Sequence, residues 1–162
     1  MIELKDASAS LTLKDVVIDG AEYSVAAENA AETDSIIKAA SGGTIELKSG
    51  AILENNKAAQ FGSGILAING VEITMEDGAV IRNNTNRNYE LGGGILLGNG
   101  STFTMNGGEI SGNTANGGGG VAIIGSTMVM NGGKISNNST YKTTGQGSYG
   151  AGVYVANYAN AS

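Results

Sequence analysis

The chain has 162 residues, enough for one domain, with 27 Gly, a net charge of −6 and no Cys, His, Pro or Trp. Without Cys and His it can form no disulfide, no thiolate metal site and no Ser-His or Cys-His catalytic pair. The negative charge disfavours nucleic acid and anionic membranes as partners, and no apolar run approaches the ~20 residues of a membrane helix. We expect no cofactor, no metal ion, no nucleic-acid binding and no membrane insertion.

The first forty residues are the least regular part of the chain. Leu11 to Leu13 and Val17-Ile18 match the start of a later repeat, and Ile2 and Leu4 fit the strand before it. Residues 21–33 are rich in Ala and Glu and fit either a short helix or a long loop. We predict irregular first rungs with an insertion over 1–40, regular rungs over 41–155 and a tail over 156–162. The N-terminus lacks the features of a signal peptide, and we expect a piece of a longer protein.

From residue 44 onwards two sequence motifs alternate along the chain, and each is called a phrase here. The first phrase, at 44–47, 72–75, 102–105 and 127–130, alternates apolar and polar residues with the period of a strand. The second, at 64–67, 94–97, 120–123 and 152–155, alternates in the same way. Between them we predict a short third strand, centred on Ile52, Val80, Ile110 and Ile135.

These repeats predict an all-β fold, a right-handed single-stranded parallel β-helix (solenoid). It would have three short strands per rung of about 25–32 residues and about five rungs. An antiparallel sandwich of the same strands would need hairpin turns at similar positions. It would not explain why like residues recur at like positions.

Two residue types mark the predicted corners. Gly tolerates a positive φ at the corner between the first and second strands of a rung. Asn tolerates it at the next corner, where stacked amides can form a hydrogen-bonded ladder. The predicted structural positions are Gly50, Gly78, Gly108, Gly133, Asn55, Asn83, Asn113 and Asn138. In the same register, opposite charges meet on adjacent rungs in the pairs Lys48–Glu76, Glu54–Arg82 and Glu109–Lys134.

The loops that follow the Asn corner vary in length while the rest of the repeat stays fixed. Variable loops on a rigid scaffold are the usual place for recognition, and all of these loops would emerge along one edge. Tyr, Asn and Arg offer stacking surfaces and directional hydrogen bonds of the kind a saccharide site needs. The candidate ligand-binding residues are Arg87, Asn88, Tyr89, Tyr141, Gln146 and Tyr149. A solvated loop edge, or a contact with a neighbouring domain, is the alternative interpretation.

Phrases such as Met105-Asn106-Gly107-Gly108-Glu109-Ile110 resemble the right-handed β-helix repeats of bacterial surface and secreted proteins. The pairing of Gly92 to Ile95 with Ile110 to Asn113 is also similar to the repeats of chlamydial polymorphic outer-membrane proteins. In those repeats Phe stands where this chain has Ile or Val, and Ala stands where this chain has Gly. The resemblance implies an adhesin-like or stalk-like role outside the cell or at its surface.

We therefore expect a non-catalytic scaffold that binds a glycan or a host or cell-surface protein at its loop edge. One alternative is a fragment of a β-helix polysaccharide lyase or glycosidase. A glycosidase needs two facing carboxylates. The chain has few carboxylates, and only Glu46 and Glu72 are expected to approach each other, diagonally, on one outer face. The other alternative is a self-assembling filament subunit that associates end to end.

Overall fold

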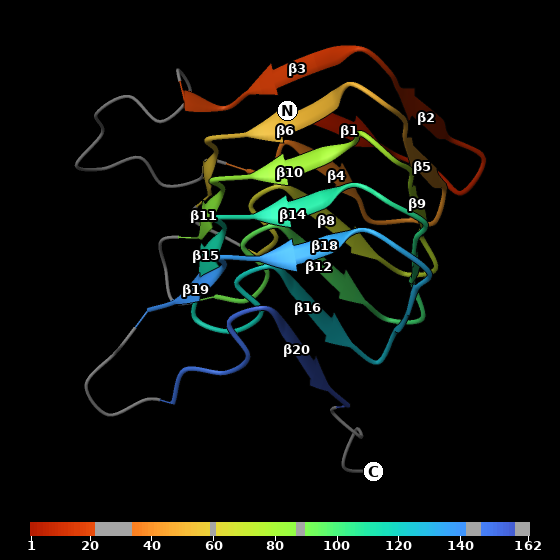
Figure 1. Ribbon diagram of the computed structural model, residues 1–162. Helices are drawn as coiled ribbons and strands as arrows, with labels where there is room; N and C mark the ends of the chain where they lie inside the picture. Colours follow the sequence, from red (N-terminus) through yellow and green to blue (C-terminus); the bar gives the residue numbers. More distant parts are fainter. Residues whose placement is uncertain (22–33, 59–60, 87–89, 142–146, 158–162) are drawn as a thin grey trace, which may run out of the picture.

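Figure 1 shows the computed structural model, in which residues 1–21, 34–58, 61–86, 90–141 and 147–157 are described. They form strands joined by turns, without an α-helix, and all strand pairs are parallel. The chain therefore winds as a parallel β-solenoid, which confirms the predicted fold class, although it has about four turns where the sequence suggested about five rungs. In Figure 1 the front strands run to the left and the strands behind them run to the right as the chain descends, which makes the coil right-handed.

Four parallel sheets, named A to D here, form the walls. Sheet A contains β1 (Ile2–Leu4), β4 (Ile37–Ala39), β8 (Ile65–Ile68), β12 (Ile95–Gly98), β16 (Val121–Ile124) and β20 (Val153–Ala156). Sheet B contains β2 (Ser10–Leu13), β5 (Thr44–Leu47), β9 (Glu72–Met75), β13 (Thr102–Met105) and β17 (Thr127–Met130). Sheet C contains β3 (Val16–Asp19), β6 (Ala51–Glu54), β10 (Val80–Arg82), β14 (Glu109–Ser111) and β18 (Lys134–Ser136). Sheet D contains β7 (Lys57–Ala58), β11 (Thr85–Asn86), β15 (Thr114–Ala115) and β19 (Ser139–Thr140).

Sheet D is the element that the repeats did not predict. Its strands have two residues each, too few to show an alternation in the sequence. The rungs that reach sheet D therefore have four strands, where the sequence suggested three.

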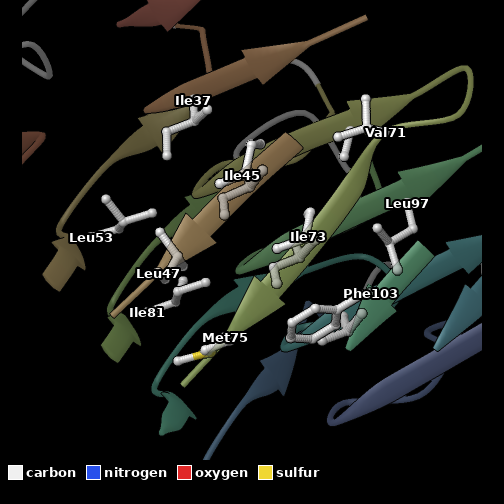
Figure 2. Close-up of a cluster of buried hydrophobic side chains, with 14 of the residues drawn as sticks. Ile37, Ile45, Leu47, Leu53, Val71, Ile73, Met75, Ile81, Leu97 and Phe103 are labelled. Carbon is white, nitrogen blue, oxygen red and sulfur yellow. The ribbon is translucent and has the colours of Figure 1, made fainter. Parts of the chain in front are cut away.

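Aliphatic side chains from sheets A, B and C fill the interior. The predicted alternation is confirmed: Ile45, Ile73 and Phe103 lie in register on β5, β9 and β13, and all three are buried. Figure 2 shows this column beside Leu47 and Met75, which form the next one along the same strands. Because each column repeats at the ~4.8 Å spacing of strands, like residues pack on like residues from rung to rung.

The inward residues of sheet C differ from the prediction in two rungs. Leu53 and Ile81 are buried and align with Ile110, whereas Ile52 and Val80 are half-buried. The choice of Ile52 and Val80 as strand centres was therefore wrong by one residue. Both members of each adjacent apolar pair suit a strand, so composition alone did not show which one faces inward.

The cause of this shift is one extra residue between sheets B and C in these two rungs. Five positions separate Met75 from Val80, and the rung of Ile52 has the same register, whereas four positions separate Met105 from Glu109, the residue aligned with Val80. The corner glycines Gly78 and Gly108 both have a positive φ, as predicted, but they do not occupy the same register position. Counting onward from these glycines therefore carried an error of one residue across the next strand. The predicted corner glycines Gly50 and Gly133 also have a positive φ.

The asparagine corner contains two positions with separate tasks. Asn55 and Asn83 have φ values of 61° and 56° and turn the chain, but they do not form the ladder. The next residue in each rung points inward and forms it. The ladder therefore consists of Asn56, Asn84, Asn113 and Asn138, so the prediction was right for the last two and wrong for Asn55 and Asn83.

The two central ladder amides are held by the rungs on both sides of them. The backbone N–H and the Nδ2 of Asn84 donate to the Oδ1 of Asn113, at 2.9 and 3.1 Å, and the same Nδ2 donates to the Leu53 carbonyl. Asn113 donates in the same way to the Oδ1 of Asn138 and to the Ile81 carbonyl. Because Asn84 and Asn113 are fully buried, these bonds replace the water that the amides lose on folding.

The outer charges follow the predicted register, but not all of them pair as predicted. Arg82 Nε lies 2.6 Å from the Glu54 carboxylate, as expected, and Glu109 stands opposite Lys134 in register. Lys48 pairs instead with Glu46 of its own rung, at 3.1 Å. The Glu76 carboxylate accepts a hydrogen bond from Asn106, one rung further on.

The first strands belong to the same solenoid. β1, β2 and β3 pair in register with β4, β5 and β6, which confirms the expected match of Ile2/Leu4, Leu11 to Leu13 and Val17-Ile18 to a rung. The predicted insertion falls mostly on residues 22–33, outside the described residues. The boundaries at 40/41 and 155/156 stay predictions.

Candidate functional site

The connections from sheet D to sheet A are the longest and the most variable in the described rungs. They span residues 59–64, 87–94, 116–120 and 141–152, that is six, eight, five and twelve residues. The connections from C to D always have two residues, and those at the other two corners have two to five. All four long connections leave the solenoid at the corner between sheets D and A, which we call the loop edge.

A short parallel strip runs along the loop edge. Leu91, Gly117 and Tyr149 lie side by side in successive rungs and are joined by isolated bridges. In each of these rungs a glycine with a positive φ follows and turns the chain back into sheet A. At Gly118, for example, a Cβ would stand 2.5 Å from the Val121 carbonyl oxygen, so the chain reverses too tightly for a side chain.

The predicted ligand-binding residues are only partly within the described chain. Arg87, Asn88, Tyr89 and Gln146 lie outside the described residues. Tyr141 and Tyr149 both lie on the loop edge, as predicted. Tyr141 is half-buried and its N–H donates to the Ala115 carbonyl, whereas the Tyr149 side chain is half exposed.

Tyr154 is a residue of this edge that the sequence analysis did not single out. It occupies an outward position of β20, and its ring centroid lies 5.4 Å from that of Tyr149, with 30° between the ring planes. Tyr149 precedes the turn glycine and Tyr154 follows it by four residues. The signal was therefore present: the turn folds the residue before the glycine against the outward residue five positions later.

Asn116 is the second residue that the sequence analysis missed. Its side chain is 8% exposed, and its Oδ1 is buried without a hydrogen-bond partner. Its backbone is well held, since its N–H donates to the Glu90 carbonyl and its C=O accepts from Tyr149. Among the described residues no other buried side-chain oxygen or nitrogen lacks a partner. An unsatisfied buried acceptor is unusual in a folded protein, and it lies on the loop edge.

A second feature lies at the opposite end of the strands of sheet A. A solvent-open recess of about 440 Å³ is lined by Gly100, Gly125, Ser126, Thr127, Val155 and Asn157. None of these side chains carries a charge, and two of the residues have no side chain. The recess is therefore neutral, with hydroxyl and amide groups at its rim.

One pair of carboxylates was expected to approach on an outer face of the solenoid. Glu46 and Glu72 lie diagonally on β5 and β9, as predicted, but Glu46 is engaged by Thr12 and Lys48. In the part of the chain that is described, no three Asp or Glu residues gather closely enough to hold a metal ion. Nor does that part include a helix long and apolar enough to cross a membrane.

The chain gives no significant match to a protein-family model, to a curated protein or to a solved structure. Its function is therefore inferred from its own geometry.

Proposed function

We propose that the chain is a non-catalytic scaffold of a bacterial surface or secreted protein, adhesin-like, whose loop edge recognises a glycan or a protein. The observation that carries this proposal is the concentration of length variation at one corner. The connections there reach twelve residues, whereas the strands on both sides keep strict register. A rigid frame with variable loops is the arrangement in which recognition sites are commonly found.

The chemistry of the loop edge supports the same proposal. Tyr149 and Tyr154 form an aromatic pair with an exposed ring, which suits the apolar face of a sugar or an aromatic side chain. Asn116 holds an acceptor without a donor on the same edge. The exposed ring offers a contact surface for a ligand, and the unsatisfied acceptor beneath the same edge needs an explanation that a solvated turn does not supply.

The proposal can be tested by screening the purified chain on a glycan array and on a panel of host-cell surface proteins. We expect saturable binding to at least one ligand, reduced at least ten-fold when Tyr141 and Tyr149 are both changed to Ala. The matched control changes Thr74 and Thr104 to Ala on the outer face of sheet B, which does not adjoin the loop edge. Binding that the tyrosine variant keeps in full would contradict a site at the loop edge.

A further inference from the structure

The outer face of sheet A is apolar in β8, β12 and β16, the strands of its central rungs, which have a neighbouring strand on each side. None of their outward residues belongs to the interior cluster of aliphatic side chains, and none has a polar side chain. We call these residues the sheet A wall: Leu66, Ile68, Leu96, Gly98, Ala122 and Ile124. The outward residues of β5, β9 and β13 in sheet B are all Thr or Glu, and those of sheet C include Glu54, Arg82 and Glu109. In these rungs the solenoid therefore turns an apolar face outward at sheet A.

The loop edge extends this wall at the amino ends of its strands. The parallel strip that includes Leu91 and Gly117 continues into the preceding rung, where the Gly62 N–H donates to the Leu91 carbonyl at 3.1 Å. The next rung repeats this bond, from Gly92 to Gly117, at 3.0 Å. Phe61 therefore holds the place of Leu91 one rung earlier, and 43% of its surface is exposed. The strip thus adds an exposed aromatic ring to the wall, in the rung that lies between β4 and β12.

The strip lies directly over the wall. A Cβ at Gly92 would stand 2.8 Å from the Leu96 nitrogen, and one at Gly118 would stand 2.7 Å from the Ala122 Cα. This close cover explains why Leu96 and Ala122 are buried although they point outward.

Two glycines make the apolar surface continuous from one rung to the next. The position of a Cβ at Gly117 lies 2.8 Å from Leu91 Cδ2, and the same position at Gly98 lies 2.9 Å from Ile68 Cγ2. In both places the larger side chain of the preceding rung lies across the glycine. The rungs of β8 and β12 therefore share one apolar floor.

Exposed amides border the wall at the carboxyl ends of its strands. Asn69 and Asn99 directly follow β8 and β12, and Asn99 Nδ2 donates to Asn69 Oδ1 at 3.1 Å. They form an outer column, in which Gly125 takes the same place after β16. Because both asparagines are exposed, a ligand on the wall can reach their amides. The wall therefore combines an apolar floor with directional polar groups at one rim, and neither carries a charge.

The size of the wall decides between a protein and a chain-like ligand. Three strands of four residues cover about 13 by 14 Å, which is about 200 Å². A stable interface with a second copy of this chain, or with another protein, needs about 800 Å² from each partner. A single polymer chain needs a contact only as wide as itself. Because the wall and its rim are uncharged, they suit an uncharged polymer.

We infer that the sheet A wall and Phe61 bind a flat, uncharged polysaccharide chain of the β-1,4-linked type. The inference rests on the proposed function, because it names the ligand class of the loop edge. A β-1,4-linked glucan is a stiff ribbon with C–H groups on its faces and hydroxyls along its edges, so it loses little conformational entropy on binding. The chain crosses the wall along β8 and β12: one sugar ring stacks on Phe61, and the next units lie on Leu66 and Ile68. At the far rim its hydroxyls bond to the amides of Asn69 and Asn99.

The ligand class can be tested by following backbone amide resonances during titration with cellohexaose, maltohexaose or hexagalacturonic acid. The first two contain the same sugar, but only cellohexaose is a flat ribbon, and hexagalacturonic acid carries a charge on every unit. We expect saturable shifts at Phe61, Ile68 and Asn99 with cellohexaose, and about ten-fold weaker binding of the other two. Equal binding of maltohexaose, or no binding of cellohexaose, would overturn the inference. If the screen described above still finds another ligand, the proposed function stands without it, whereas a screen without any ligand overturns both.

Ile68→Thr provides the protein-side test, because threonine keeps a methyl branch over Gly98 and makes the wall polar. We expect about five-fold weaker binding of cellohexaose. Ile52→Thr is the matched control: Ile52 is also half-buried and points outward, but on sheet C, so binding should not change. Melting temperatures of the two variants show whether both fold equally well.

Phe61→Ala is the second variant, and it should also weaken the binding of cellohexaose about five-fold. Full affinity in both Phe61→Ala and Ile68→Thr, or an equal loss in Ile52→Thr, would overturn the assignment to the sheet A wall. A surface protein that needs Phe61 and Ile68, while cellohexaose does not bind, would show that the wall takes a protein and would overturn the inference as well.

Discussion

The two asparagine columns of this solenoid use the same chemistry in different surroundings. The inner ladder, Asn56, Asn84, Asn113 and Asn138, is continuous through four rungs, and its two central members are fully buried. The outer column, which starts at Asn69 and Asn99, is exposed and is interrupted at Gly125. Water can satisfy an exposed amide when its neighbour is absent, whereas a buried amide must find a protein partner.

This difference indicates which hydrogen bonds specify the fold. In the inner ladder each central amide ties its own rung to the preceding one, because it accepts from an N–H of that rung and donates to one of its carbonyls. Loss of one member would leave several groups without partners. In the outer column the position without an amide, Gly125, is exposed to solvent.

The largest effect is expected from Asn113→Ala in the inner ladder. The substitution leaves the Asn84 N–H and Nδ2 without their shared acceptor and the Ile81 carbonyl without its donor. We expect a loss of about 3 kcal/mol in the free energy of unfolding, because each unsatisfied buried group costs about 1–3 kcal/mol. Urea unfolding would measure it. A loss below about 1 kcal/mol would mean that water enters the corner and replaces the ladder.

Asn116→Leu sharpens the comparison, since Asn116 is also buried but its Oδ1 has no partner. Replacing an unsatisfied amide with an apolar side chain of similar size removes its desolvation cost. We expect unchanged stability or a gain of up to about 1 kcal/mol in urea unfolding. Asn113→Leu is the matched control and should be strongly destabilising. Equal losses in both leucine variants would show that steric fit, and not hydrogen bonding, dominates at these positions.

A smaller effect is expected from Asn99→Gly in the outer column. Glycine keeps the positive φ of Asn99 and removes only the amide that donates to Asn69. Because water can replace that bond, we expect a loss below about 1 kcal/mol in the free energy of unfolding. A loss as large as that of Asn113→Ala would remove the distinction between the two columns.

The sequence predicted the solenoid because its buried strands alternate strictly. Ile45, Ile73 and Phe103 could be placed in one column from the sequence alone, since period two and repeat spacing both specify their register. The same logic failed at Ile52 and Val80, because their rungs have one more residue between the aligned positions of sheets B and C than the rung of Ile110 has. When repeats are aligned on their corner glycines, an extra residue in a corner goes unnoticed and shifts the assignment of the next strand by one residue.

The loop edge was predicted from loop length, but most of its details were not. Tyr141 and Tyr149 could be proposed because aromatic residues in variable loops are noticeable in a sequence. Asn116 could not be proposed, because its distinguishing property is the lack of a partner, which depends on the packing of three rungs. The recess at Gly125 was also missed, since only the structure aligns that glycine with Asn69 and Asn99.

The smallest effect is expected in the turn between β1 and β2, where the hydrogen bonds between Asp6 and Ser8 are exposed. The Ser8 hydroxyl donates to the Asp6 carboxylate at 2.6 Å, and the Ser8 N–H donates to it at 2.9 Å. Both bonds lower the pKa of Asp6 below its usual 3.8, and the bond from the hydroxyl has the larger effect. A carboxyl whose pKa is lowered by folding stabilises the folded state above its unfolded pKa. That contribution is lost as the pH falls through the folded pKa. In Ser8→Ala we expect the pKa of Asp6, followed by NMR, to rise toward 3.8, whereas Ser126→Ala should leave it unchanged. An unaltered pKa in Ser8→Ala would mean that this corner is not held by its side-chain hydrogen bond, and the contrast with the buried ladder would then be larger still.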